Sequence, residues 1–102
     1  MSCAQYFALS VLVVMGAAPM ATAADRQAES WAASCAACHG TGGYSVGGMP
    51  ALAGRPASDV LTRLRAFRAG EGEPTLMHQI ARGYSDVELA RIATVFAAQP
   101  AP

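Results

Sequence analysis

The stretch SCAACHG, residues 34–40, decides more about this chain than any other segment of its length. Two cysteines stand two residues apart, and a histidine follows the second directly. C-x-x-C-H is the pattern at which c-type haem is attached. Two thiols one helical turn apart can each form a thioether with a haem vinyl group, while the adjacent imidazole reaches the iron. The sequence therefore predicts one covalently bound haem c, with Cys35 and Cys38 as attachment sites and His39 as an iron ligand.

Three other uses of these residues compete with haem. A thioredoxin-like redox pair is expected after a strand in a βαβ pattern, and nothing in this chain is patterned as a strand. A structural zinc ion needs four ligands, which His78 could complete together with the two cysteines and His39, although zinc sites favour paired motifs. A plain disulfide between the two cysteines is the third alternative. We favour haem because the pentapeptide, an export signal and a small core agree.

The export signal lies at the N-terminus. An apolar stretch runs over residues 6–18 and is followed by the small residues of 21–24, which is typical of a secretory signal cleaved after Ala23 or Ala24. The stretch is too short for a membrane span, which needs ~20 apolar residues. It contains no Lys or Arg, so an uncleaved anchor helix is the alternative. We expect a signal peptide over residues 1–24, a domain over 25–102 and a periplasmic location.

Charge and size limit what the remaining domain can do. All seven arginines and all seven acidic residues lie at or after Asp25, and lysine is absent. This balance provides no basic field for nucleic acid. A domain of this size has a marginal core and usually needs a disulfide, a metal or a cofactor for stability.

The apolar periodicity of the domain is helical throughout. We expect a first helix that carries the cysteine motif, capped by Asp25 and ended by Gly40, and then a glycine-rich loop. A second helix starts near Ser58 and Asp59 and ends before Gly70, with its apolar face formed by Val60, Leu64 and Phe67. Arg63, Arg65 and Arg68 occupy its other faces, as a solvated surface or as a docking patch for an acidic partner.

The last helix is predicted by a capping box, Ser85-Asp86-Val87-Glu88, in which the Ser85 and Glu88 side chains satisfy exposed backbone donors. Leu89, Ile92, Ala93 and Phe96 form its apolar face. A short helix near Met77 completes the set. The pattern predicts an all-α domain, with three main helices, one short helix and loops around a planar cofactor.

Three residues are candidates for the second iron ligand: Met49, Met77 and His78. Met49 follows His39 by ten residues, which is a short path to the opposite face of a porphyrin, so we expect it to pack within its loop. Met77 and His78 are both far enough along the chain. Adjacent helical residues point about 100° apart, so only one of the two can face the iron.

Helical phase favours the methionine. Met77 shares an apolar side with Ile80 and Ala81, whereas His78 falls beside the polar residues Gln79 and Arg82. We therefore expect Met77 to bind the iron, with plain core packing of its side chain as the alternative. His78 is expected at the surface or beside a haem propionate, so a substitution there should leave the haem spectrum nearly intact.

With these motifs in hand, the domain resembles class I c-type cytochromes over essentially its whole length. The resemblance rests on CAACHG, on a P-x-L-x-G-R loop (Pro50, Leu52, Gly54, Arg55) and on a late methionine. It implies that the Pro50 carbonyl accepts a hydrogen bond from the ligand imidazole, that Leu52 packs at the haem edge and that Arg55 approaches a propionate. It also implies that Met77 is the sixth ligand and that the first and last helices cross, with Trp31 and Phe96 in contact.

The run TLMHQIARGYSDVELARIATVFAAQP, residues 75–100, is similar to the end of the monohaem cytochrome subunit of flavocytochrome c sulfide dehydrogenases. This resemblance implies an FAD-containing sulfide dehydrogenase subunit as electron donor and a further protein as acceptor, with no bond-making chemistry in this chain. A free-standing soluble cytochrome is the first alternative. An enzyme or sensor with an open sixth position on the iron is the second.

Overall fold

The computed structural model describes residues 24–102, so almost all of the predicted signal peptide lies outside the described residues. In chain order, the elements are α1 (Arg26–Ala33), α2 (Ala36–His39), the short 3₁₀ helix η1 (Thr41–Gly43), α3 (Ala57–Arg68), α4 (Leu76–Arg82) and α5 (Asp86–Ala97). No strand occurs in this range, which confirms the all-α prediction. Within residues 24–102, no helix combines the length and apolarity needed to cross a bilayer.

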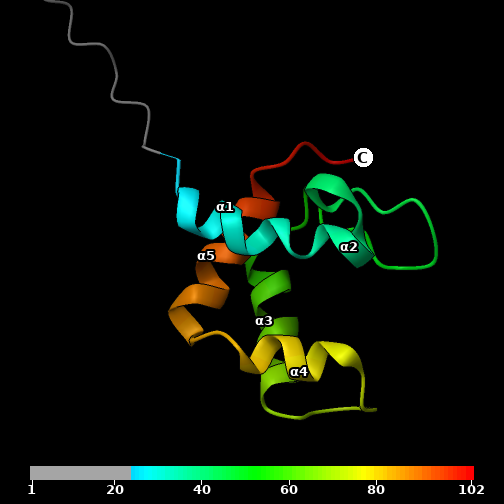
Figure 1. Ribbon diagram of the computed structural model, residues 1–102, viewed down its shortest axis with the longest axis vertical. Coiled ribbons are helices and arrows are strands. Elements are labelled where there is room, and N and C mark those ends of the chain that lie inside the picture. The colour runs from blue at the N-terminus through cyan, green and yellow to red at the C-terminus, as the bar shows by residue number, and fades with distance from the viewer. Residues whose placement is uncertain (1–23) are drawn as a thin grey trace, which may run out of the picture.

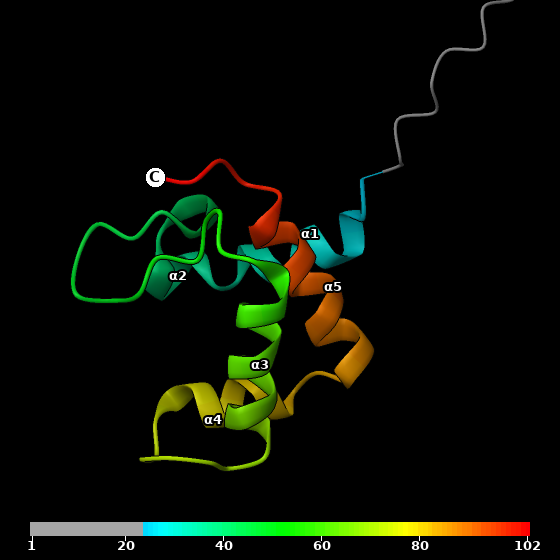
Figure 2. The ribbon, with the colours of Figure 1, turned by 180° about the vertical axis from the view of Figure 1, so that it is seen from behind.

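The helices meet at two places joined by α3. Figures 1 and 2 show α1 and α5 together at one end of α3, and α4 beside its other end. In agreement with this, α3 packs against both α4 and α5, and α1 packs against α5. The cysteine motif and the methionine of α4 therefore belong to opposite parts of the fold, with α3 between them.

The predicted crossing of the first and last helices is present. Its centre is built from small side chains, because Ala28, Ala32 and Ala93 are all 5% exposed or less. Trp31 packs against the cluster formed by Ala32, Ile92 and Phe96. The aromatic ring that meets Trp31 edge-on is Tyr84, with centroids 6.1 Å apart. The predicted apolar face of α5 is confirmed, because all four of its residues are buried: Leu89, Ile92, Ala93 and Phe96.

The prediction that one continuous first helix carries the cysteine motif is wrong. α1 ends at Ala33 and α2 begins at Ala36, with a tighter turn between them. The Ser34 hydroxyl donates to the Trp31 carbonyl at 2.7 Å, and the Cys35 amide donates to Ala32, three residues back, at 3.0 Å. A serine hydroxyl that competes for a helical carbonyl is a known cause of such breaks. The two cysteines consequently lie at the start and within the last turn of a separate short helix.

The glycine-rich loop turns back onto α5 at Gly43. The Gly43 carbonyl accepts hydrogen bonds from the backbone amides of Leu52, at 2.8 Å, and Ala53, at 3.2 Å. Gly43 has φ +84°, and a Cβ there would lie 2.9 Å from the Phe96 ring. Only glycine tolerates both conditions at low cost. This closure holds the segment that carries Met49 and Pro50 next to α2.

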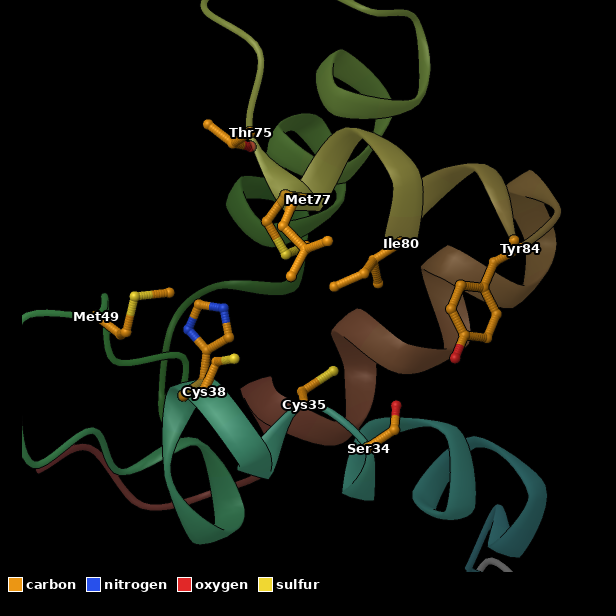
Figure 3. Close-up of a pocket in the computed structure, with 11 residues that line it drawn as sticks. Ser34, Cys35, Cys38, Met49, Thr75, Met77, Ile80 and Tyr84 are labelled. Atoms are coloured by element: carbon orange, nitrogen blue, oxygen red, sulfur yellow. The ribbon is translucent and has the colours of Figure 1, made fainter.

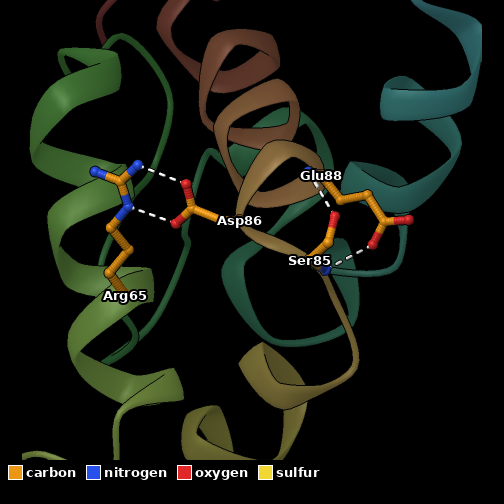
Figure 4. Close-up of polar contacts among 4 residues, drawn as sticks. All are labelled: Arg65, Ser85, Asp86 and Glu88. Atoms are coloured by element: carbon orange, nitrogen blue, oxygen red, sulfur yellow. Dashed lines mark hydrogen bonds and ion pairs between the residues drawn. The ribbon is translucent and has the colours of Figure 1, made fainter.

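α5 begins as predicted. The Ser85 amide donates to the Glu88 carboxylate at 2.8 Å, and the Glu88 amide donates to the Ser85 hydroxyl at 3.2 Å (Figure 4). In the same turn, Asp86 accepts two hydrogen bonds from Arg65 of α3, at 2.6 and 2.7 Å. Arg65 therefore joins α3 to α5.

Candidate cofactor site

Two adjoining cavities, of about 560 and 710 Å³, occupy the space between α2 and α4. Cys35, His39, Met49, Thr75 and Met77 line both of them, so the two form one continuous hollow. The smaller cavity extends to Tyr84, and the larger one follows the apolar face of α3. Volumes of this order are typical of small-molecule and cofactor sites.

His39 is fixed at the α2 side of this hollow. Its side chain is 7% exposed, and its Nδ1 lies 2.7 Å from the Pro50 carbonyl oxygen. Because a carbonyl only accepts, Nδ1 must carry the hydrogen, and in the neutral ring Nε2 then has the free lone pair. This is the arrangement in which a second hydrogen bond orients a metal-binding histidine. The Pro50 contact that the resemblance implied is therefore confirmed.

Cys35 and Cys38 lie beside His39 as free thiols, and both side chains extend from α2 into the smaller cavity (Figure 3). Cys35 is half-buried and Cys38 is exposed. Burial raises the pKa of the Cys35 thiol, which keeps the group protonated and neutral. The two cysteines and His39 thus line one cavity, from α2 and the residue that precedes it.

The zinc alternative is not supported by this geometry. His78, the fourth ligand that it would need, lines neither cavity. Among residues 24–102, no three side chains of the types His, Cys, Asp and Glu converge in a way that could hold a metal ion.

The two methionines reach the hollow from different sides. Met77 projects from α4 toward the side chains of α2, whereas Met49 approaches from the glycine-rich loop (Figure 3). Met49 is 45% exposed and lines both cavities, so the expectation that it packs within its loop is wrong. It directly precedes Pro50, whose carbonyl holds His39, and this bond ties Met49 to the His39 side of the hollow.

The prediction that His78 faces outward is also wrong. His78 is 6% exposed, and its ring meets Phe67 of α3 edge-on at a centroid distance of 5.2 Å. Helical phase placed it beside Gln79 and Arg82, which are indeed exposed. The segment before α4 folds over the other part of that face, and the Glu71 carbonyl lies 2.7 Å from His78 Nε2. A periodic pattern within α4 contains no information on this tertiary contact.

The P-x-L-x-G-R loop lies along the larger cavity. Leu52 is half-buried, packs against the core cluster and lines the cavity. Arg55 also lines it, and its Nε donates to the Ala51 carbonyl at 2.7 Å. Thr75 and Tyr84 were not predicted to line the hollow. Thr75 directly precedes α4. Because threonine is a favoured N-cap residue, the sequence could have placed it at the start of this helix.

Comparison with known proteins places the chain among cytochromes. Residues 22–94 match the family described as Cytochrome C oxidase, cbb3-type, subunit III. Over 72 residues, the chain is 35% identical to the cytochrome subunit of sulfide dehydrogenase from Chlorobaculum tepidum, covering 71% of this chain and 66% of that protein. Over 70 residues, it is 36% identical to cytochrome c-554(548) from Halomonas halodenitrificans, and the match covers 65% of this chain and 84% of that protein.

A further relative has a different printed role. Over 73 residues, the chain is 38% identical to the thiosulfate dehydrogenase electron acceptor from Stutzerimonas stutzeri, covering 70% of this chain and 34% of that protein. The chain thus spans just under two thirds of the sulfide dehydrogenase subunit and about one third of this acceptor.

Proposed function

The chain belongs to the cytochrome c family that its residues 22–94 match, and we propose that it carries electrons on a single covalently attached haem c with His39 and Met77 as axial ligands. Family membership establishes the coarser function, which is electron transfer by a haem-binding protein rather than catalysis. The number of haems, the attachment sites, the ligands and the partners are our proposals.

The residues around the hollow fit a haem c. Cys35 and Cys38 provide two thiols at thioether spacing, and His39 provides a nitrogen lone pair beside them. The observation that carries the proposal is the 2.7 Å contact between His39 Nδ1 and the Pro50 carbonyl, because it leaves Nε2 as the free ring nitrogen. When bound, haem supplies one-electron redox chemistry at its iron.

The protein's own residues set the conditions of that chemistry. Pro50 holds the His39 ring in one orientation. The position of Met77 supports its role as the second ligand, because Met77 lines the same cavities as His39 but extends from α4, on the opposite side of the hollow from α2. Met49 supports it less well, since Pro50 ties it next to His39. A thioether ligand raises the reduction potential relative to other axial sets.

Substitution of the two methionines tests the ligand. We expect Met77→Ala to give a high-spin or ligand-exchanged spectrum with a lowered midpoint potential, because the iron loses its thioether. Met49→Ala should keep the spectrum of the parent protein. Absorption spectroscopy and redox titration measure both. The opposite pattern, or rapid binding of carbon monoxide by the unsubstituted protein at neutral pH, would overturn the assignment in favour of an open sixth position.

We propose a dehydrogenase as the electron donor, and specifically a flavin-containing sulfide dehydrogenase subunit. The relative named as a sulfide dehydrogenase cytochrome subunit supports this partner. The relative named as a thiosulfate dehydrogenase electron acceptor supports the coarser proposal of a dehydrogenase that oxidises a sulfur compound. The cytochrome of which the chain covers 84% supports the alternative of a free-standing carrier. Co-expression with a candidate flavoprotein should yield a complex in which sulfide reduces the haem. Reduction by thiosulfate alone, or no complex, would reject the flavoprotein partner.

We also propose export to the periplasm, with residues 1–24 removed. Support comes from the signal-like sequence and from the structure of the first helix, since Asp25 caps α1 by accepting the Ala28 amide at 3.1 Å. Cleavage after Ala23 or Ala24 therefore leaves the cap in place. N-terminal sequencing of the protein from a periplasmic fraction tests this, and a chain that still begins at Met1 would contradict it.

A further inference from the structure

His78 is a buried polar side chain next to Met77 that the proposed haem site does not use. It is 6% exposed and lines neither cavity. Its ring nitrogens contact the backbone on both sides of the turn that leads into α4. Nδ1 lies 3.1 Å from the Thr75 amide and Nε2 lies 2.7 Å from the Glu71 carbonyl.

These contacts define the state of the imidazole. The Thr75 amide can only donate, so Nδ1 accepts, and the Glu71 carbonyl can only accept, so Nε2 carries the hydrogen. The ring is therefore the neutral Nε2–H tautomer. Nδ1 also lies 3.2 Å from the Thr75 hydroxyl, so all of the ring's polar contacts join α4 to the chain segment in front of it.

The segment that the ring joins to α4 has little else to hold it. All residues from Glu71 to Thr75 are exposed, and a side chain added at Gly72 would meet nothing within 4 Å. Glu71 is bound to α3 through its amide, which donates to the Ala66 carbonyl at 3.0 Å. The His78 ring also packs on Phe67 of α3. His78 thus connects the end of α3 to the first turn of α4, one residue from Met77.

We propose that His78 is a positioning residue, whose two backbone hydrogen bonds hold the first turn of α4 in the orientation that presents Met77 to the haem iron. The inference rests on the proposed ligation by Met77. It reverses the expectation from sequence that a substitution at His78 leaves the haem nearly unchanged. His78 itself does not contact the cavity, so its effect is transmitted through the backbone of α4.

His78→Ala in the haem-loaded protein tests this, with Gln79→Ala as the matched control because Gln79 is the exposed next residue of α4. Loss of the clamp should raise the fraction of molecules in which Met77 is away from the iron. If that fraction rises tenfold, apparent cyanide affinity rises about tenfold as well. The midpoint potential should fall, and hydrogen exchange at the Thr75 amide should accelerate. Gln79→Ala should change none of the three.

Two conservative variants provide a rescue. His78→Asn keeps an acceptor for the Thr75 amide, and His78→Gln keeps a donor for the Glu71 carbonyl, so each should fall between the parent protein and His78→Ala. If His78→Ala folds poorly, these two variants can be compared with the parent protein in its place. Unchanged cyanide affinity and potential in every His78 variant, while Met77→Ala alters both, would overturn the positioning role alone. Unchanged values in Met77→Ala would instead overturn the ligand assignment.

Discussion

The starts of α4 and α5 solve the same problem with different side chains. In α5, Ser85 precedes the helix and the Glu88 carboxylate accepts the Ser85 amide at 2.8 Å. In α4, Thr75 precedes the helix and the His78 ring accepts the Thr75 amide at 3.1 Å. Both arrangements satisfy a backbone donor that a helix leaves without a partner. The α5 start faces solvent, whereas the α4 start is built on a buried ring.

This difference shows what burial demands of a capping side chain. Glu88 can carry a charge because water reaches it. His78 must accept from Thr75 and also donate to Glu71, because a buried polar group without a partner destabilises the fold. A neutral imidazole does both, since it has one donor and one acceptor on opposite sides of a flat ring. A carboxylate can only accept.

Exchange of the two side chains should give the largest effect. His78→Glu places a carboxylate in a buried site and turns it toward the Glu71 carbonyl, so we expect a loss of roughly 3 kcal/mol or more in unfolding free energy. Glu88→His places a ring at an exposed start and should cost under about 1 kcal/mol. Urea denaturation of the two holoproteins measures both. Equal losses would show that burial is not what separates the two starts.

Removal of the exposed cap should have a smaller effect. Ser85→Ala removes the hydroxyl that accepts the Glu88 amide, and we expect a loss of about 1 kcal/mol in unfolding free energy. The midpoint potential should stay unchanged, because Ser85 lines neither cavity. A potential that moves with Ser85→Ala would indicate that helix starts in this fold influence the haem irrespective of their contact with Met77. Denaturation and redox titration of the same sample give both quantities.

These two starts also mark the limits of prediction from sequence. The Ser85-to-Glu88 box was recognisable because serine and glutamate at that spacing act within one turn. The apolar faces of α3 and α5 were recognisable for the same local reason. His78 was misplaced because its partners, Glu71 and Phe67, belong to segments that only the tertiary fold brings onto α4.

The candidate site shows the same division. Cys35, Cys38 and His39 lie within five residues of sequence, so their shared cavity followed from the motif. The break at Ser34 and the exposure of Met49 did not, because the first depends on a hydroxyl that competes with the helix and the second on how the glycine-rich loop is anchored. The hydrogen bond to Pro50 was accessible only through the family resemblance, since nothing local to Pro50 indicates its partner.

The start of α1 adds an exposed cap whose strength depends on pH. Asp25 accepts from Arg91 and from the Ala28 amide, and these bonds lower the pKa of its carboxyl from 3.8 to about 2. A lowered folded-state pKa stabilises the protein above the ordinary pKa, and that contribution is lost as the pH falls from 3.8 to about 2. Asp25→Asn should make unfolding less steeply dependent on pH in this window. Denaturation at several pH values measures it, and Glu29→Gln on the same helix is the control.

The smallest effect is expected from the ion pair at the start of α5. Arg65 and Asp86 are 52% and 50% exposed, and exposed pairs of this kind are screened by salt. A double-mutant cycle with Arg65→Ala and Asp86→Ala should give a weak coupling at low salt. It should vanish near 1 M salt, where the screening length is ~3 Å. A coupling that persists at high salt would show that Arg65 joins α3 to α5 more firmly than its exposure suggests.

At the crossing of α1 and α5, the buried residues of α1 are the alanines Ala28 and Ala32, and among residues 24–102 Leu89 is the one large side chain that is less than 2% exposed. The interior also contains the hollow between α2 and α4. A group that binds only the folded chain lowers the population of open forms that proteases cut. Chains that have received haem should therefore survive longer in the presence of proteases than chains that have not.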